Sequence, residues 1–142
     1  MKTQHYKNHS RYSFTWHLAI PLVILASLVG SIVNLVNTES SNSYSAALIL
    51  VIILLLIGFY IYTRWFALRA QDRAIRAEEN LRHFILTGKP LDSRLSMSQI
   101  IALRFASDAE FPSLAIRAAE EKLTSKQVKQ SIRDWKPDYN RV

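Results

Sequence analysis

Two apolar stretches without a charged residue constrain this chain of 142 residues more than any other feature of its sequence. The first covers residues 18–36, and the second covers residues 46–62 and can be extended to Phe66. About 20 residues of α-helix cross a hydrocarbon core that is about 30 Å thick, so both stretches are long enough to span a membrane. Two buried helices of a soluble protein are the alternative, but charge-free runs of this length are rare in soluble cores. The sequence therefore predicts two transmembrane helices, over residues 18–36 and 46–66.

A short connection and an uneven distribution of positive charge define the expected topology. Residues 37–45 are rich in Ser and Asn, and a connection this short makes the two helices antiparallel. All 18 Lys and Arg residues lie either within residues 1–17 or from Arg64 onward. The positive-inside rule then places both termini in the cytoplasm, with the protein in a bacterial inner membrane. A signal peptide is the alternative for the first stretch, but its apolar core would be only about 7–15 residues long.

Small and polar side chains mark one side of the first apolar stretch. Ala26 and Gly30 form a small-xxx-small pair, and Ser27, Ser31 and Asn34 follow on a neighbouring face. Such residues let helices approach closely and form hydrogen bonds in lipid. They predict a contact either with the second stretch or with another membrane subunit. Neither stretch contains Asp, Glu, Lys or Arg, which argues against an ion or proton pathway through this chain alone.

The second helix is expected to continue past the membrane as a cytoplasmic stalk over residues 67–87. No Gly or Pro interrupts this segment before Gly88, which ends it. Two acid–base pairs, Asp72–Arg76 and Glu78–Arg82, are spaced i, i+4 with the acid first, which is the order that stabilises a helix.

Small and apolar residues recur along the stalk with alternating spacings of three and four, the heptad pattern of a helix that packs closely on another helix. They are Ala67, Ala70, Ala74, Ala77, Leu81 and Phe84. The alanines are candidate contacts with a partner protein, and the alternative is that they pack against the chain's own tail. The N-terminal run is more charged and aromatic than an anchor requires, which adds four candidate contacts: Tyr6, Asn8, His9 and Arg11.

Residues 88–142 are expected to form a small module of about three helices. Ser96 with Gln99 and Thr124 with Gln127 have the spacing of a capping box, and another helix is expected to start near Pro112. Apolar side chains at helical spacing predict the core of this module. They are Met97, Ile100, Ile101 and Phe105, then Phe111, Leu114, Ala115, Ala118 and Leu123, then Val128, Ile132 and Trp135. A module this small buries little surface, so we expect it to pack on the stalk, the membrane or a partner.

Basic side chains recur near the C-terminus with spacings of four and three. They are Lys122, Lys126, Lys129, Arg133 and Lys136. On one helix they would form a stripe suited to an acidic partner. A solvated helix face, anionic lipid of the cytoplasmic leaflet and nucleic acid are the three interpretations, with nucleic acid the least favoured.

The sequence offers no pattern that predicts a catalytic residue, a metal site or a cofactor. The chain has no Cys, so thiolate chemistry is excluded. His5 and His9 are spaced i, i+4, but only His17 follows nearby and His83 lies far along the chain, so a metal or haem site is not favoured. No nucleophile elbow and no glycine-rich phosphate loop occurs. A non-enzymatic role is therefore expected.

Three segments carry a resemblance to a known family. The run from Gln4 to Arg11, the run from Gln99 to Asp108 and the ending from Ile132 to Val142, together with the two apolar stretches, resemble an uncharacterised family of small two-span bacterial membrane proteins. The resemblance implies a topology and no activity.

These features predict an all-α membrane protein that serves as an accessory or structural subunit, or as a scaffold, of an inner-membrane assembly. Its expected partners are membrane lipid and either another protein or further copies of itself. The first alternative is a membrane-tethered module that binds anionic lipid or nucleic acid through the basic stripe. The second alternative is a membrane enzyme of unknown class.

Overall fold

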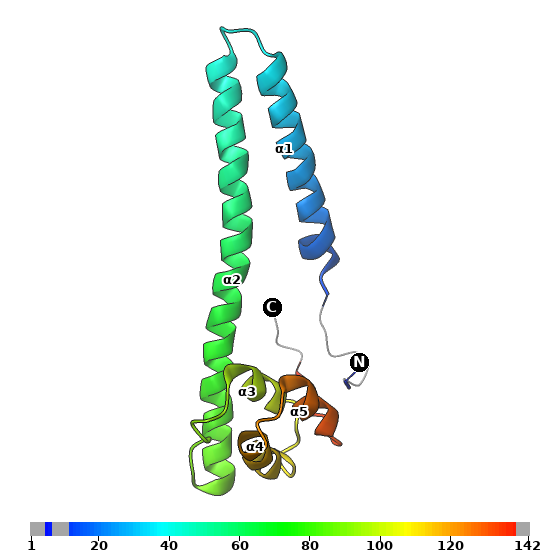
Figure 1. Cartoon of the computed structure of the whole chain (residues 1–142), viewed down its shortest axis with the longest axis vertical. Helices are drawn as coiled ribbons and strands as arrows, with labels where there is room; N and C mark the ends of the chain where they lie inside the picture. Colours follow the sequence, from blue (N-terminus) through cyan, green and yellow to red (C-terminus); the bar gives the residue numbers. More distant parts are fainter. Residues whose placement is uncertain (1–4, 7–11, 139–142) are drawn as a thin grey trace. The chain divides into compact units, whose positions relative to one another are not determined.

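The computed structural model describes residues 5–6 and 12–138, and every regular element in this part of the chain is a helix (Figure 1). In chain order the elements are the π-helix η1 (Thr15–Ala19) and the α-helices α1 (Ile20–Asn37), α2 (Ser43–Thr87), α3 (Met97–Leu103), α4 (Phe111–Glu120) and α5 (Ser125–Ser131). The predicted all-α fold is confirmed. The chain divides into two compact units: a hairpin unit, described over residues 12–66, and a module unit, described over residues 5–6 and 67–138.

Two helical segments are long and apolar enough to cross a membrane. Thr15–Asn37 has a mean hydropathy of 2.3 over its most apolar window, and Ser43–Thr87 reaches 2.7. Only 6% of each window is buried inside the protein. A core helix of a soluble protein would be mostly buried, so these helices expose the apolar side chains that such a core would cover.

The hairpin unit is closed at one end by an aromatic contact between η1 and α2. The rings of Trp16 and Tyr60 stack with their centroids 4.7 Å apart, and the Tyr60 hydroxyl donates a hydrogen bond of 2.6 Å to the Trp16 carbonyl. This contact joins the start of the first apolar helix to the end of the second apolar stretch. Within the unit, α1 and residues 43–66 of α2 run antiparallel, as predicted (Figure 1).

The small residues of α1 divide between two faces of the helix. Ser31 is only 4% exposed, and its hydroxyl donates a hydrogen bond of 2.8 Å to the Leu28 carbonyl, so it is satisfied within its own helix. Ser27 on the same face is half-buried, whereas Ala26 and Gly30 are exposed. A Cβ atom added at Gly30 would meet nothing within 4 Å. The interpretation that Ala26 and Gly30 pack the first apolar helix on the second is therefore wrong. Neighbouring residues are turned by about 100° around a helix, so Ser27 and Ser31 lie on a covered face while Ala26 and Gly30 lie on an exposed one.

The long helix α2 ends where the sequence predicts. It runs without interruption for 45 residues, to Thr87. Gly88 follows with a positive φ of 73°, and its N–H donates a hydrogen bond of 2.8 Å to the Phe84 carbonyl. This left-handed residue with its bond to the last turn is a common way to end a helix, and it favours glycine.

Both predicted capping boxes are confirmed. The Ser96 hydroxyl accepts from the Gln99 N–H at 3.3 Å, and the Gln99 side chain accepts from the Ser96 N–H at 2.7 Å. Thr124 and Gln127 make the same pair of bonds at 3.3 and 2.8 Å. Two otherwise unpaired N–H groups are thereby satisfied at each helix start. The helix expected near Pro112 is α4, with this proline in its first turn.

The core of the module unit is formed by α3, α4 and α5 together with one face of α2. Its largest fully buried side chains are Phe105, Phe111, Ile100, Leu103 and Val128. Ile75 of α2 is 6% exposed and belongs to the same apolar cluster. All of the predicted core residues belong to this cluster or pack against it. The stalk therefore completes the core of the small module, as its size requires.

A buried amide joins α3 to the end of α4. The Gln99 side chain is 7% exposed, and its Nε2 atom donates hydrogen bonds to the carbonyls of Ala118, at 3.0 Å, and Leu123, at 2.8 Å. Ala118 lies in the last turn of α4 and Leu123 in the turn that follows, so a side-chain donor from α3 holds this turn in place.

The last helix is shorter than the sequence predicts. Helix α5 ends at Ser131, Ile132 is extended, and a bend follows at residues 133–134. Trp135 forms an isolated bridge with Ala106, and its ring lies 5.1 Å from the Phe105 ring. The Lys136 N–H donates to the Phe105 carbonyl at 2.8 Å. The prediction of a helix reaching Trp135 is wrong because this segment forms its backbone hydrogen bonds with the segment after α3.

Candidate interaction surfaces

The seam, defined as Ala67, Ala70, Ala74, Ala77, Leu81 and Phe84, lies mainly on an exposed face of α2. All of its members except the half-buried Ala67 are exposed. The buried residues of this part of α2 are Ile75, Glu79 and His83, which lie on a largely opposite face. The module covers the face of Ile75, and Ala74 and Ala77 each line a hollow at its edge while remaining exposed. Close packing of the alanines against the chain's own tail is therefore not shown. Their contact with a partner protein stays a prediction.

Large apolar side chains dominate the end of the seam. Leu81, Phe84 and Ile85 are 59%, 53% and 71% exposed. Contiguous apolar exposure outside a membrane segment is typical of a surface that binds another protein.

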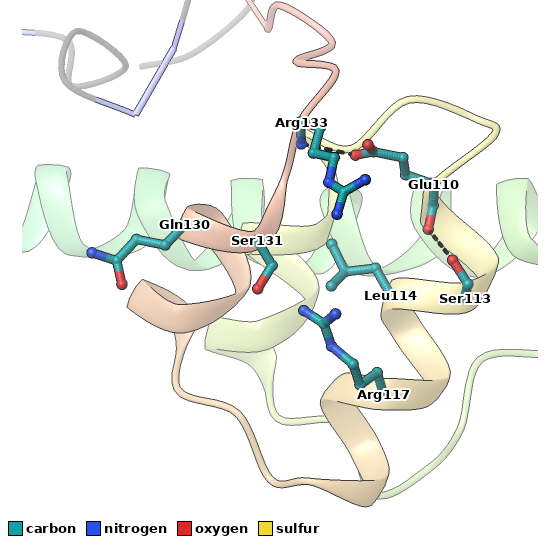
Figure 2. A pocket seen from close by; sticks show the side chains of 7 residues that line it. All are labelled: Glu110, Ser113, Leu114, Arg117, Gln130, Ser131 and Arg133. Atoms are coloured by element: carbon teal, nitrogen blue, oxygen red, sulfur yellow. Dashed lines mark hydrogen bonds between the residues drawn. The ribbon is translucent and has the colours of Figure 1, made fainter.

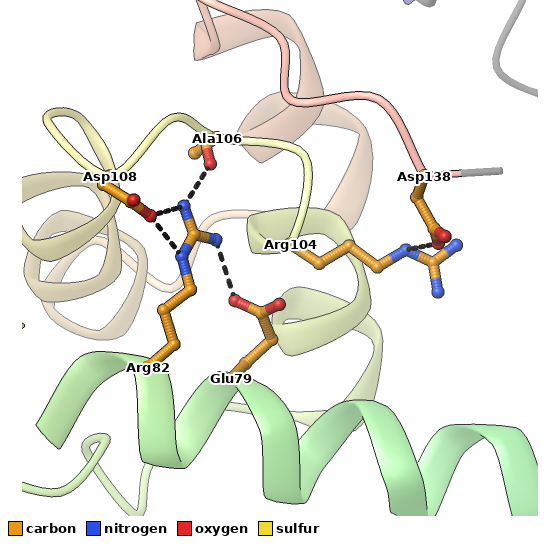
Figure 3. Close-up of polar contacts among 6 residues, drawn as sticks. All are labelled: Glu79, Arg82, Arg104, Ala106, Asp108 and Asp138. Carbon is orange, nitrogen blue, oxygen red and sulfur yellow. Dashed lines mark hydrogen bonds and ion pairs between the residues drawn. The ribbon is translucent and has the colours of Figure 1, made fainter. Parts of the chain in front are cut away.

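A buried arginine fastens the module to the stalk. Arg82 of α2 lies with its guanidinium among three acceptors, and its side chain is 12% exposed (Figure 3). It donates to the Glu79 carboxylate at 3.0 Å, to the Asp108 carboxylate at 2.7 Å and to the Ala106 carbonyl at 2.7 Å. The guanidinium carbon also lies 4.4 Å from the centre of the Phe111 ring. One side chain therefore connects α2 to the segment between α3 and α4 and to the start of α4.

The partner of Arg82 on α2 differs from the one that the spacing predicts. The sequence pairs it with Glu78 at i, i+4, whereas the structure pairs it with Glu79 at i, i+3. Glu78 is exposed, while Glu79 is only 7% exposed and lies on the face that the module covers. Tertiary packing selects Glu79, because only this carboxylate shares the buried face with Arg82.

Burial and charge shift the pKa values of the two acids in opposite directions. Burial raises the pKa of Glu79 above its usual value of 4.5, although the hydrogen bond and the charge of Arg82 act to lower it. The hydrogen bond from Arg82 lowers the pKa of the more exposed Asp108 below 3.8. Ionised Glu79 therefore costs stability as the pH rises above 4.5, whereas Asp108 contributes stability that is lost in acid.

A second ion pair lies near the C-terminal segment. Arg104 Nε lies 3.2 Å from the Asp138 carboxylate, and the Arg104 side chain is 6% exposed (Figure 3). Beside it is a hollow of about 270 Å³ that Glu78, Glu79 and Lys136 also line. This hollow contains both signs of charge, so it does not favour one class of ionic ligand.

The predicted basic stripe does not form one helix face. Lys126 and Lys129 lie on α5, but Lys122 lies in the preceding turn with a φ of 51°. Arg133 and Lys136 lie in the irregular segment after α5. The helical stripe is therefore wrong as a geometry, because α5 is too short to carry it. The Lys129 ammonium lies 5.8 Å from the centre of the Phe105 ring, so it also contributes to packing.

Arg133 instead faces a pocket with Arg117, a residue that the sequence did not single out. The pocket has a volume of about 540 Å³, and both guanidinium groups point into it beside Leu114 (Figure 2). Neither arginine forms an ion pair within residues 12–138. The Glu110 carboxylate at the rim accepts from the backbone N–H of Arg133 at 3.1 Å. Two guanidinium groups at one pocket provide the geometry for a phosphate or carboxylate ligand.

His83 and His17 have structural contacts. His83 is buried, its Nδ1 atom lies 2.8 Å from the Lys89 carbonyl, and its ring meets the edge of Phe111. His17 Nδ1 lies 2.9 Å from the Ser13 carbonyl. Within the described residues, no three His, Asp or Glu side chains are grouped closely enough to hold a metal ion.

Of the predicted contacts in the N-terminal run, only Tyr6 lies within the described residues, and it is half-buried. Asn8, His9 and Arg11 lie outside them.

Comparison with protein families gives one match, and it covers residues 1–142. The chain belongs to the DUF6526 family, a family of unknown function. No curated protein and no solved structure matches the chain. Membership of DUF6526 confirms the predicted resemblance to an uncharacterised family and brings no activity with it.

The sequence did not single out two groups of residues in this DUF6526 protein. The Glu79–Arg82–Asp108 cluster had one available signal, the i, i+3 spacing of Glu79 and Arg82, but nothing in the sequence placed Asp108 beside them. Arg117 and Arg133 are separated by α5 and its preceding turn, so only the folded module brings them to one pocket.

Proposed function

We propose that this DUF6526 protein is a non-enzymatic scaffold of a membrane assembly. It inserts η1–α1 and the first half of α2 into a bacterial inner membrane with both termini in the cytoplasm. Support comes from the hydropathy of the two helices and from the confinement of all 18 Lys and Arg residues to the segments outside the apolar stretches. The stalk and the module then stand at the cytoplasmic face.

The observation that carries the proposal is the exposed seam on the same helix that holds the second apolar stretch. The seam lies on α2, and the Arg82 cluster holds the module against the other face of that helix. Exposed Leu81, Phe84 and Ile85 provide the apolar area that a bound protein would cover. These features support a protein-binding surface on the same chain as the membrane hairpin.

Single cysteines test the topology, because the native chain has none. We expect Ser41→Cys to react with an impermeant thiol reagent from outside the cytoplasmic membrane, and Lys89→Cys to react only after the membrane is opened. Reaction of both variants from the same side would contradict the hairpin.

Native mass spectrometry tests the scaffold. The full chain, extracted in mild detergent or in lipid nanodiscs, should carry a bound protein or a further copy of itself. The double variant Leu81→Glu/Phe84→Glu should be mainly monomeric, because burial of an unpaired charge in an apolar contact is costly. Ile116→Glu is the matched control, since Ile116 is 55% exposed but lies on α4 and not on the seam. A wild-type chain that is monomeric in every gentle condition would refute the scaffold.

A second candidate function is the binding of phosphate-bearing ligands, and the pocket between Arg117 and Arg133 favours it. This candidate retains the acidic-partner prediction but replaces the helical stripe with two guanidinium groups. A dye attached at Ser113→Cys in the pocket wall would report binding of inorganic phosphate or of a short-chain phosphatidylglycerol to the full chain. Arg117→Gln/Arg133→Gln should abolish the response, whereas Arg76→Gln should preserve it. An unchanged signal at low salt would exclude this function.

A further inference from the structure

We propose that the protein covering the seam is a second copy of this chain, with the two stalks aligned in parallel. This inference rests on the proposed function, because it requires both copies to be inserted in one membrane. It identifies the partner and the register of the contact. The evidence lies in the residues that flank the seam and in the face of α2 that the module leaves open.

The seam has the geometry of one side of a two-stranded coil. Ala67, Ala74 and Leu81 take the first apolar position of successive heptads, and Ala70, Ala77 and Phe84 take the second. The alanines permit close approach of two helices, and the larger side chains provide apolar area at the far end. Ile85, which is 71% exposed, broadens the contact there because it lies directly beside the seam.

The charges beside the seam complement each other between two identical copies. In a parallel two-stranded coil, ion pairs form between the residue immediately before a first apolar position on one helix and a residue on the other helix. The second residue stands five positions further along in the sequence. Arg73 precedes Ala74, and five positions later stands Glu78. Arg73 of each copy thus meets Glu78 of the other, which forms two symmetric pairs. Both side chains are exposed, and neither forms an ion pair within the described part of the chain.

An antiparallel arrangement lacks this complementarity. In an antiparallel coil, each flank of the seam meets the same flank of the other copy. Arg73 would then meet Arg73 or Asn80 of the other copy, and Glu78 would meet its Gln71, Glu78 or Ile85. Insertion in a membrane independently selects the parallel arrangement. Two copies with the same topology point their α2 helices in the same direction, so the charge pattern and the membrane require the same alignment.

The module leaves room for the second copy. It packs on the face of α2 that carries Ile75, Glu79 and His83, which is largely opposite the seam. The hollow beside Glu78 and the hollow beside Arg73 mark the two borders where the module meets the helix. Ala74 lines the first of these hollows and Ala77 lines the second, and both residues remain exposed on the side of the seam. A second stalk can therefore pack on it without displacing the module.

Disulfide formation in intact membranes tests the pairing. Ala74→Cys should cross-link two copies on mild oxidation, because equivalent first positions face each other across a parallel coil. Arg76→Cys, two residues away and off the seam, is the matched control and should remain uncrosslinked. Cross-linking of Ala74→Cys with Ala77→Cys in a mixture, without formation of either homodimer, would indicate an antiparallel contact and overturn the proposal.

Charge reversal tests the register. Arg73→Glu and Glu78→Arg should each reduce the Ala74→Cys dimer roughly tenfold, because each replaces two attractive pairs by two repulsive ones. The combined variant Arg73→Glu/Glu78→Arg should restore the dimer, since the pairs re-form with exchanged signs. Equal dimer yield in all variants would refute the register.

The outcomes separate this inference from the scaffold itself. A seam-dependent complex in native mass spectrometry that contains a different protein, with no Ala74→Cys dimer, would overturn self-association and leave the scaffold intact. A wild-type chain that is monomeric in all gentle conditions would refute both. A seam-dependent dimer with the expected response to charge reversal would support both.

Discussion

Replacement of Arg82 by Met would test how strongly the module depends on the stalk. The guanidinium has three polar partners and packs over the Phe111 ring. Met retains an unbranched apolar stem but removes every hydrogen-bond donor. Glu79, which is 7% exposed, would then remain as a buried carboxylate without its cation.

The expected magnitude follows from this loss of pairing. Removal of one partner from a buried ion pair costs about 3–5 kcal/mol, because an uncompensated charge stays buried. The pKa of Glu79 is already raised, so proton uptake limits the loss, and we expect the lower end of this range. A loss of about 3 kcal/mol corresponds to a roughly 150-fold increase in the open population of the module.

Thiol labelling provides the assay. Ala118 is 0% exposed, and the chain has no native Cys, so Ala118→Cys reacts with a thiol reagent only when the module opens. In the full chain in detergent, Arg82→Met should increase its labelling rate roughly 150-fold at pH 7. Arg76→Met on the same helix is the control and should change the rate by less than about threefold. Arg76 is exposed, and the predicted pair with Asp72 does not form among the ion pairs of the described residues.

A double variant decides whether the buried charge is the cause. Glu79→Gln/Arg82→Met removes both charges, so it should recover at least half of the lost free energy of opening. An increase of less than about fivefold for Arg82→Met would refute the reasoning. A double variant as unstable as the single one would show that Arg82 acts through packing and not through its pairing with Glu79.

Three further predictions concern the same unit. Gln99→Leu should lower the free energy of unfolding by about 1–3 kcal/mol in urea titrations, because it removes the side-chain hydrogen bonds to the Ala118 and Leu123 carbonyls and to the Ser96 N–H. Gly88→Ala should lower it by about 1–2 kcal/mol, since the positive φ of 73° strains any residue with a Cβ although the space around it is open. Asp108 has a pKa below 3.8, so its stabilisation is complete above that value and is lost as the pH falls through its folded pKa. Stability lost between pH 6 and pH 3 should therefore be smaller in Asp108→Asn, because the contribution of this carboxylate is already absent. Ala118→Cys labelling at each pH, corrected for the reactivity of the reagent, measures this difference.

Local signals in the sequence predicted most of the secondary structure. The capping boxes at Ser96 and Thr124 mark helix starts because their hydrogen bonds join residues only three positions apart. Gly88 marks the end of α2 for the same reason, since its conformation depends on the backbone and one local hydrogen bond. The end of α5 was placed wrongly because Trp135 and Lys136 form long-range contacts with the segment after α3, which no local pattern encodes.

The sequence by itself determined the two apolar helices, the unbroken α2 and the seam along it, because hydropathy, the absence of Gly and Pro, and heptad spacing are all read along one helix. Only the tertiary structure decided which faces of these helices are covered. It buries Ser31 and exposes Gly30, pairs Arg82 with Glu79 and Asp108, and places the module opposite the seam. The physical reason is that periodicity defines the faces of a helix, whereas the choice among them depends on how well residues distant in sequence pack and pair when the chain folds.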